Sequence, residues 1–303
     1  MSCLLCPRHC AIDRRQTTGF CKAPEWPEVA AICRHTGEEP PLTGQRGICN
    51  LFFAHCNLQC LYCQNHLISH PETASDHIHY RTVEAIVERI AEVLTTTENM
   101  VGFVSPSHYA HLIPIIVEAL HSAGLHPTVV YNTGGYDSVE TLRMLEPYID
   151  IYLPDYKYSD TRLAAQLSHT GDYPQRAADA LGEMYRQKGS SLHVDDNGLA
   201  FGGIIVRHLV LPGAVVNSLH CLDWLAENLS TRLHISLMAQ YYPTDNLAKS
   251  LPPDSPLLRT LTADEYQQVV DHFHALGFYN GWIQALNASD SYRPDFTQKD
   301  AFR

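Results

Sequence analysis

The strongest constraint on the fold is a run of three closely spaced cysteines, Cys56, Cys60 and Cys63, with the spacing C-x3-C-x2-C. A [4Fe–4S] cube normally takes four thiolates, so a loop that supplies three leaves one iron open. Zinc usually takes four ligands, often as two C-x2-C-type pairs, and fits this loop poorly. Because a buried, strand-like apolar segment (50–54) directly precedes the loop, the sequence predicts a cluster loop carried at the end of a strand.

Composition excludes several classes of function. The 303 residues suffice for one large domain with an appendage. With 21 Lys+Arg against 33 Asp+Glu, the formal net charge is −12, which argues against binding to nucleic acid or an anionic membrane. The start of the chain lacks the features of a secretory signal, and no apolar stretch is long enough to span a membrane. We therefore expect a cytoplasmic protein whose cysteines bind metal rather than form disulfides.

Apolar strand-like segments alternate with amphipathic helix-like segments from about residue 48 onward. The strands are expected at 48–54, 100–104, 128–132, 149–153, 203–209 and 233–238, and helices at 82–94, 113–123, 138–145, 177–186, 216–229 and 262–276. The last helix has a capping box, Thr262 with Glu265, and a stop at Gly277. This α/β pattern predicts a parallel sheet covered by helices, and six strands suit a partial (β/α)6 barrel. The pattern alone does not separate the barrel from an open doubly wound sheet.

Three segments are expected along the chain. Residues 1–46 are rich in cysteine, proline and glycine and read as a loop-rich, metal-binding segment. Residues 47–260 form the partial barrel, and residues 261–303 form a final helix and a polar, irregular tail.

Polar side chains follow or end nearly every expected strand, where ligands sit in parallel α/β proteins. The candidate ligand-binding residues are Tyr62, Asn65, Ser107, Asn132, Thr133, Asp155, Lys157, Arg207 and His208. Asp155 and Lys157 point to the same face of an extended chain, so they form either part of a pocket or a surface ion pair. Arg207 and His208 are alternatively a core pair, and Tyr62 alternatively packs in the core. Any one of the 18 histidines is usually structural or solvated.

A second group of cysteines lies near the start of the chain: Cys3, Cys6, Cys10 and Cys21, with the spacing C-x2-C-x3-C-x10-C. Four thiolates suit either a structural zinc ion or a second Fe–S cluster, and the spacing does not separate the two. Ordinary free thiols are the remaining alternative. Cys221 lies in an apolar helix pattern and reads as a core residue.

Longer motifs resemble the family of pyruvate formate-lyase activating enzyme-like proteins with an N-terminal cysteine segment, within the radical S-adenosylmethionine (radical SAM) enzymes. The resemblance covers nearly the whole chain. It is carried by residues 3–10, 19–21, 38–41, the cysteine loop, 105–109, 131–136, 149–158, 183–184, 207–213, 240–243 and 281–284.

The resemblance implies a fold, a reaction and cofactors. It implies a radical SAM partial barrel in which S-adenosylmethionine chelates the open iron. Reduction of the cluster would cleave S-adenosylmethionine to methionine and a 5′-deoxyadenosyl radical, which abstracts hydrogen. It also implies that Asp155 and Lys157 contact the cofactor, with Asn132 and Thr133 nearby.

The implied substrate is a glycine Cα–H on a glycyl-radical protein, and the implied electron donor is a protein such as flavodoxin or ferredoxin. One alternative is a radical SAM enzyme that modifies a small molecule or a peptide. Another is an Fe–S electron-transfer or redox-sensing protein, which the missing fourth ligand speaks against. A zinc-binding interaction module would leave the polar strand ends unexplained.

The chain departs from the family pattern at a few positions. Small residues are usual where this chain has Cys49, Asn50 and His55, and Cys33 is an extra cysteine. His55 directly precedes the first cluster cysteine, so it would change hydrogen bonding near the cluster. The sequence does not assign roles to Cys33 or Cys49.

Overall fold

A computed structural model describes residues 3–290, 294–298 and 301–302. In this part of the chain the centre is one sheet in the order β1-β2-β3-β4-β5-β7-β8-β9, with β6 paired to β7. The strands are β1 (Val29–His35), β2 (Ile48–Phe53), β3 (Met100–Val104), β4 (Thr128–Thr133), β5 (Ile151–Pro154), β6 (His193–Val194), β7 (Ala200–Leu209), β8 (His234–Met238) and β9 (Gly281–Ile283). Neighbours from β2 to β9 along this order are parallel, whereas β1 runs antiparallel to β2 and β6 antiparallel to β7.

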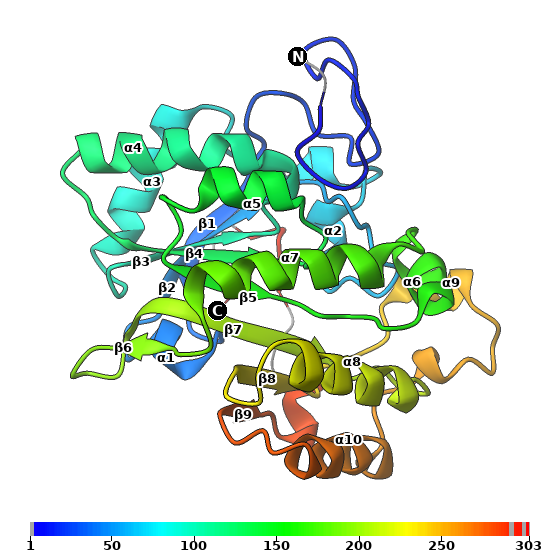
Figure 1. Cartoon of the computed structure of the whole chain (residues 1–303). Coiled ribbons are helices and arrows are strands. Elements are labelled where there is room, and N and C mark those ends of the chain that lie inside the picture. The colour runs from blue at the N-terminus through cyan, green and yellow to red at the C-terminus, as the bar shows by residue number, and fades with distance from the viewer. Residues whose placement is uncertain (1–2, 291–293, 299–300, 303) are drawn as a thin grey trace.

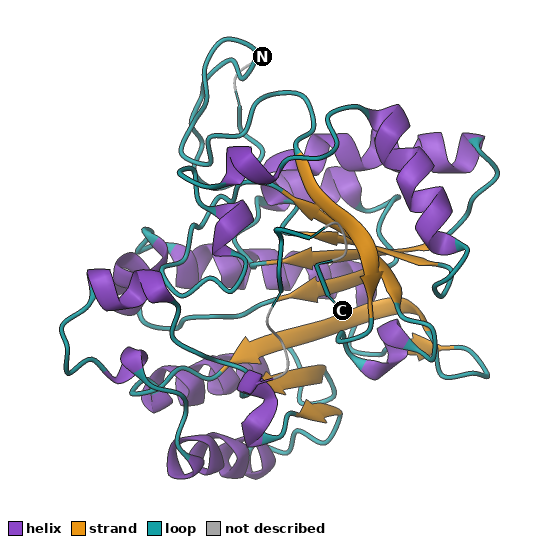
Figure 2. Ribbon diagram, turned by 180° about the vertical axis from the view of Figure 1, so that it is seen from behind, coloured by secondary structure: helices purple, strands orange, loops and turns teal. Residues whose placement is uncertain are grey.

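The longer helices cover one face of the sheet, and the described residues form ten α-helices in all. They are α1 (Pro40–Thr43), α2 (His66–Ser69), α3 (Val83–Leu94), α4 (Ile113–Ser122), α5 (Val139–Leu145), α6 (Thr161–Ser168), α7 (Tyr173–Lys188), α8 (Val215–Asn228), α9 (Asp245–Ser250) and α10 (Ala263–Ala275). Figure 1 shows α4, α5, α7 and α8 in front of the strands. Figure 2, from behind, shows the end of the chain lying across the opposite face. The sheet begins at β1 and ends at β9 without closing, which confirms the expected α/β partial barrel.

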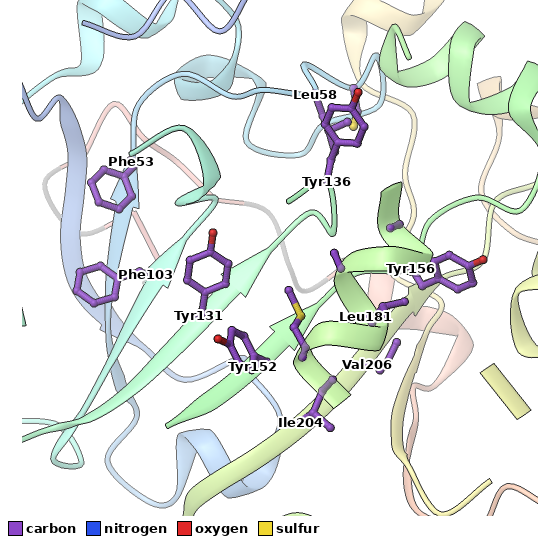
Figure 3. Close-up of a cluster of buried hydrophobic side chains, with 14 of the residues drawn as sticks. Phe53, Leu58, Phe103, Tyr131, Tyr136, Tyr152, Tyr156, Leu181, Ile204 and Val206 are labelled. Atoms are coloured by element: carbon purple, nitrogen blue, oxygen red, sulfur yellow. The ribbon is translucent and has the colours of Figure 1, made fainter. Parts of the chain in front are cut away.

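Side chains that alternate along each strand separate two faces of the sheet. On the helix-covered face, Phe103, Tyr131, Tyr152 and Ile204 are direct neighbours across β3, β4, β5 and β7. All four are fully buried (Figure 3). The opposite face, which carries Phe52 and other alternate residues, faces the interior of the half-barrel. Strands buried on both faces explain the continuous apolar runs in the sequence.

Most of the expected elements are present. The six expected strands correspond to β2, β3, β4, β5, β7 and β8, and the expected helices to α3, α4, α5, α7, α8 and α10. The final helix has the expected capping box, because Thr262 accepts from the backbone of Glu265 and Glu265 accepts from that of Thr262.

Most of the described part of residues 1–46 is loop, as expected, but the segment also contains a strand that the sequence did not predict. Val29–His35 forms β1, which pairs with β2 over six residue pairs. A single antiparallel strand at the edge of a parallel sheet does not repeat the strand–helix alternation that marks the rest of the chain, so the pattern did not reveal it. Strands β6 and β9 were also missed because they span two and three residues.

Some parts of the expected segments 1–46 and 261–303 lie outside the described residues, namely 1–2, 291–293, 299–300 and 303. Within the described part of the chain, no helix has the length and apolar character needed to cross a bilayer.

Candidate functional site

A cavity of about 210 Å³ lies where the loops after the parallel strands meet. Nearly all candidate residues from the sequence line it: Cys56, Cys60, Tyr62, Cys63, Asn65, Ser107, Asn132, Thr133, Asp155, Lys157 and Arg207. The cysteine loop follows β2, and the other residues come from the ends of β3, β4, β5 and β7. The structure therefore brings into one cavity residues that lie up to about 150 positions apart in the sequence.

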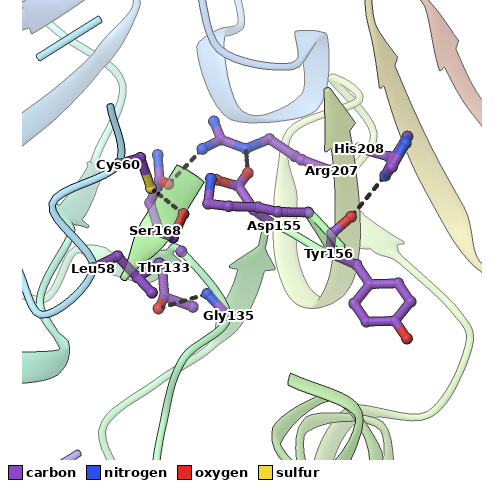
Figure 4. A network of polar contacts seen from close by, with 12 residues as sticks. Leu58, Cys60, Thr133, Gly135, Asp155, Tyr156, Ser168, Arg207 and His208 are labelled. Carbon is purple, nitrogen blue, oxygen red and sulfur yellow. Dashed lines mark hydrogen bonds and ion pairs between the residues drawn. The ribbon is translucent and has the colours of Figure 1, made fainter. Parts of the chain in front are cut away.

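His208 is the candidate that does not line this cavity. It lies next to Arg207 on β7, and side chains alternate between the two faces of a strand. His208 is fully buried, with Nδ1 2.6 Å from the carbonyl oxygen of Tyr156 and Nε2 2.8 Å from Ser218 Oγ (Figure 4). Burial lowers the pKa of His208 to about 4, so at neutral pH it is an uncharged residue on the side of β7 that faces α8.

The surroundings of the three loop cysteines fit thiolate ligands. Each sulfur has a hydrogen-bond donor: Leu58 N lies 3.4 Å from Cys56 Sγ, Ser168 Oγ 3.0 Å from Cys60 Sγ, and Ser69 Oγ 3.3 Å from Cys63 Sγ. Burial raises the pKa of all three thiols, that of Cys63 to about 12. Buried thiolates at neutral pH therefore require a positive charge beside them, and a bound metal cluster supplies one.

The loop takes its shape from left-handed residues and from contacts with other segments. His55 and Gln59 have φ angles of 70° and 53°, which turn the chain before and within the cysteine run. Gln59 Nε2 donates to the carbonyl oxygen of Phe20, and Asn57 Nδ2 donates to that of Tyr136. The segments before β1 and after β4 thus hold the loop over the sheet.

A buried ionic network forms one wall of the cavity. Asp155 accepts from Lys157 Nζ at 2.5 Å and from Arg207 Nε at 3.0 Å. Arg207, which Figure 4 shows beside Asp155, also donates to Asn132 Oδ1 at 2.8 Å and pairs with Glu38 at 3.3 Å. Burial would raise the pKa of Asp155, but Lys157 and Arg207 hold it below its usual range. Asp155 and Lys157 form an ion pair, and this pair is buried rather than on the surface.

Two glycines shape the turn after β4. Gly134 lines the cavity, and a Cβ there would lie 2.9 Å from Leu58 Cδ1. Gly135 has φ +81°, and a Cβ there would lie 2.2 Å from the carbonyl oxygen of Asp155. Only glycine fits this left-handed, crowded position. The turn therefore presents backbone rather than side chains to the cavity.

Asp137 holds this turn in place through hydrogen bonds. Its carboxylate accepts from Thr133 Oγ1 at 2.6 Å and from Tyr131 Oη at 2.7 Å. Thr133 Oγ1 is also 3.1 Å from Ser107 Oγ and accepts from Gly135 N at 3.2 Å. Asp137 is 2% exposed, so it fixes two candidate residues, Thr133 and Ser107. Sequence analysis missed it because it lies four positions beyond the strand end.

Glu38 and Glu39 close the cavity at the end opposite the cysteine loop. Glu38 accepts a hydrogen bond from Asn50 Nδ2 at 2.8 Å. Asn50 stands where the resembled family usually has a small residue, so this departure supplies a donor to Glu38. Gly102 makes room for Asn50, because a Cβ on Gly102 would lie 2.2 Å from Asn50 Oδ1. Oε2 of Glu39 is buried without a hydrogen-bond partner among the described residues. The motif 38–41 was noted in the sequence, but nothing in it indicated this position.

The four N-terminal cysteines line a second, much smaller cavity of about 10 Å³, together with Arg8, Arg14 and His108. Arg14 is 4% exposed, and its hydrogen bonds go to the carbonyl oxygens of Ala23, Pro24 and His108. No three Cys, His, Asp or Glu side chains in the described ranges are grouped closely enough for a single metal ion. The thiolates of an Fe–S cube bind different irons and so stand farther apart than the ligands of one ion.

The remaining unassigned residues lie in the protein interior. His55 Nε2 is 2.6 Å from Glu28 Oε2, and Arg81 also pairs with Glu28. Cys33, Cys49 and Cys221 are fully buried and line neither cavity.

No protein-family model matches the chain. A curated protein of Methanocaldococcus jannaschii, described as uncharacterised, is 28% identical over 279 residues, which is 89% of this chain and 73% of that protein.

Three solved structures are similar to this chain at 13–15% identity. A domain of a pyruvate-formate lyase-activating enzyme from Bacteroides vulgatus has 14% identity and a TM-score of 0.38, covering 58% of this chain and 92% of that domain. The [FeFe]-hydrogenase maturase HydG has 13% identity and a TM-score of 0.48, covering 80% and 53%. Methylornithine synthase (PylB) has 15% identity and a TM-score of 0.44, covering 84% and 78%. Because these scores lie below 0.5, conclusions about function depend on the residues of the chain itself.

Proposed function

We propose that this chain is a radical SAM enzyme with a [4Fe–4S] cluster held by Cys56, Cys60 and Cys63. One observation carries the proposal: three cysteine sulfurs and a buried ionic wall face the same cavity at the carboxyl ends of a parallel sheet. When bound and reduced, the cluster supplies one electron that cleaves the C5′–S bond of S-adenosylmethionine, giving methionine and a 5′-deoxyadenosyl radical that abstracts hydrogen.

The side chains of the cavity have roles that follow from their chemistry. The turn at Gly134 leaves room for a ligand against the backbone. Asp155 and Lys157 offer one acceptor and one donor group to the ammonium and carboxylate of the methionine moiety. Arg207 holds Asp155 in place from the next strand. No acid–base residue is required, because the protein binds and orients the cofactors and keeps water out.

The finer assignment is the substrate. We infer from the family resemblance that the enzyme abstracts hydrogen from a glycine Cα on a glycyl-radical protein, with flavodoxin or ferredoxin as electron donor. The test combines the reduced enzyme, S-adenosylmethionine and glycyl-radical proteins encoded in the same genome. A glycyl doublet in the electron paramagnetic resonance (EPR) spectrum supports this substrate, and a genome without any such protein rules it out.

A specific observation favours a second candidate, the modification of a small molecule or a peptide. Pro294 and Phe302, near the end of the chain, line the cavity. Phe302 packs on His35 and Phe52, with ring centroids 4.2 Å and 5.4 Å apart. A cavity that residues near the C-terminus cover in this way suits a small substrate better than a polypeptide loop.

The radical SAM assignment is tested on protein that is purified and reconstituted without oxygen. We expect about four irons in the loop cluster and formation of 5′-deoxyadenosine from S-adenosylmethionine and a strong reductant. Replacing Cys56, Cys60 and Cys63 together by alanine should abolish both. The matched control is Cys221→Ala, which also removes a buried thiol but lies outside the cavity. A triple variant that still forms 5′-deoxyadenosine refutes the assignment.

We also propose that Cys3, Cys6, Cys10 and Cys21 bind a second metal centre, and the separation of their side chains favours an Fe–S cluster over a single zinc ion. Their convergence on one cavity supports this proposal. Arg8 and Arg14 line the same cavity, and two guanidinium groups match the net negative charge that four thiolates keep around a metal centre of charge +2.

A further inference from the structure

The cluster loop contacts a chain of buried hydroxyl groups that the proposed reaction does not use. Ser168 Oγ lies 3.0 Å from Cys60 Sγ and 2.7 Å from Tyr158 Oη, and Tyr158 Oη lies 2.7 Å from Tyr62 Oη. Ser168 and Tyr158 are fully buried, and Tyr62 and Cys60 are 5% and 7% exposed. The contact between Ser168 and Cys60 is drawn in Figure 4.

The direction of every hydrogen bond in this chain follows from a count of hydrogens. A cysteine that ligates iron is a thiolate, which accepts but cannot donate. The single hydroxyl hydrogen of Ser168 therefore points to Cys60 Sγ. Tyr158 then donates to Ser168, and Tyr62 donates to Tyr158. All three hydroxyl dipoles are aligned toward the sulfur.

The backbone fixes Ser168 against the loop. Ser168 is the last residue of α6, and Leu61 N donates to the carbonyl oxygen of Leu167 at 2.9 Å. Arg8 joins the two segments, because Nε donates to the carbonyl oxygen of Asn57 at 2.9 Å and Nη2 to that of Ser168 at 3.2 Å. The distance between Ser168 Oγ and Cys60 Sγ is thus set by the packing of three segments.

We propose that Ser168, backed by Tyr158 and Tyr62, is a positioning residue that raises the reduction potential of the cluster. This inference rests on the proposed cluster at Cys56, Cys60 and Cys63. In the reduction, the cluster gains one electron, an external reductant such as titanium(III) citrate loses it, and no bond in the hydroxyl chain breaks. The added electron makes the sulfur a stronger acceptor, so a donor stabilises the reduced form more than the oxidised form.

The other loop sulfurs have weaker donors. Ser69 Oγ and Leu58 N lie 3.3 Å and 3.4 Å from Cys63 and Cys56. Among the described residues, neither donor has a chain of buried hydroxyls behind it, whereas Ser168 is polarised by two tyrosines in series. Ser168 is therefore the position at which a single substitution should shift the potential most.

The test is a redox titration of the reconstituted full chain, followed by EPR without S-adenosylmethionine. In Ser168→Ala we expect the reduction equilibrium to move about tenfold toward the oxidised form, a midpoint about 59 mV lower for one electron, with altered EPR g values. Ser168→Thr keeps the hydroxyl, so its midpoint should lie close to that of the parent protein. The control, Thr97→Val, removes a buried hydroxyl bonded to Val93 at the end of α3 and should leave the midpoint unchanged.

An unchanged midpoint in a fully loaded Ser168→Ala protein overturns the proposal, as does an equal shift in Thr97→Val. If Ser168→Ala does not hold iron, Tyr158→Phe provides the test, because it keeps the Ser168 donor and should lower the midpoint by less. Loss of iron in both variants assigns Ser168 a purely structural role and also overturns the proposal. Because no S-adenosylmethionine is present, the result is separate from the 5′-deoxyadenosine test of the proposed function.

Discussion

Arg207 on β7 donates through Nε to Asp155 Oδ1 at 3.0 Å, directly beyond the end of β5. Within the strands, β5 and β7 pair at only two positions, and one further β-bridge joins Asp155 to Arg207. The ion pair therefore links the ends of β5 and β7, two strands that share few backbone pairs. It also positions the carboxylate that faces Lys157 in the cavity.

Replacing Asp155 by asparagine should destabilise the protein and weaken cofactor binding. Lys157 and Arg207 would then be two buried cations without their shared counter-ion, and breaking a buried pair typically costs about 3–5 kcal/mol. The free energy of unfolding, from anaerobic urea titration, measures the first effect. The dissociation constant for S-adenosylmethionine measures the second.

Arg176→Gln is the control for this prediction. Arg176 pairs with Asp172 on the surface, where both side chains are more than 40% exposed, so its loss should change the free energy of unfolding little. Equal stability of Asp155→Asn and the parent protein would contradict the role given to Asp155.

The two glutamates at the closed end of the cavity should respond to pH in opposite directions. Burial alone would raise the pKa of Glu38, but His35 and Arg207 lower it to about 2 from an ordinary value of 4.5. Its contribution to stability is therefore present above pH 4.5 and is lost as the pH falls toward 2. Glu38→Gln should lower the free energy of unfolding at pH 7 and flatten its fall with acid.

The pH dependence of stability expected for Glu39 has the opposite sign to that for Glu38. Burial, together with the charge of Glu38, raises the pKa of Glu39 despite the opposing effect of Arg207. A raised pKa means that stability is lost as the pH rises through the folded-state value. Glu39→Gln should therefore keep or increase the stability at neutral pH. Urea unfolding of the iron-free chain at several pH values measures both variants, and a matching loss in both at pH 7 would refute the assignment.

Gly135→Ala should be costlier than Gly124→Ala. Both glycines have left-handed backbones, with φ +81° and +78°, and an alanine there costs about 1–2 kcal/mol. At Gly124 the new Cβ meets nothing within 4 Å, whereas at Gly135 it lies 2.2 Å from the carbonyl oxygen of Asp155. Overpacking adds about 1–3 kcal/mol. Thermal unfolding compares the two variants, and equal melting temperatures would show that the turn relaxes freely.

Removal of the N-terminal thiols should remove metal without removing the loop cluster. Cys6→Ala and Cys21→Ala each delete one of the four thiols that face the small cavity. Metal binding at such a site stabilises the folded segment, so both variants should lose zinc or iron and become less heat-stable. Cys221→Ala is the control. Zinc and iron contents identical to those of the parent protein in both variants would mean that the four cysteines bind no metal.

The parts of the structure that could be predicted are those with a local signature. Thr262 and Glu265 lie three residues apart, and the capping box they form appears as expected. The C-x3-C-x2-C spacing placed three sulfurs in one loop. By contrast, only the four-residue helix α1 separates β1 from β2, so β1 does not fit the alternation of strands with long helices, and it is stabilised by pairing with β2.

The parts of the site that could not be predicted depend on distant contacts. Glu38 is 169 positions from Arg207, and Ser168 is 108 positions from Cys60. No spacing rule joins such residues, because they meet only after the sheet is assembled. His208 shows that prediction is also limited within one strand. It directly follows Arg207, and because side chains alternate between the two faces of a strand, His208 lies on the face away from the cavity.

The antiparallel pairing of β1 has a consequence for any attempt to dissect the chain. β1 covers the backbone of β2, the strand that delivers the cysteine loop, and the same N-terminal segment contributes Glu38 to the cavity. A protein that began at residue 47 would present the free edge of β2 to solvent, and uncovered edges invite other chains to pair with them. The N-terminal segment thus protects the edge of the sheet, and we expect a chain without it to be more prone to self-association.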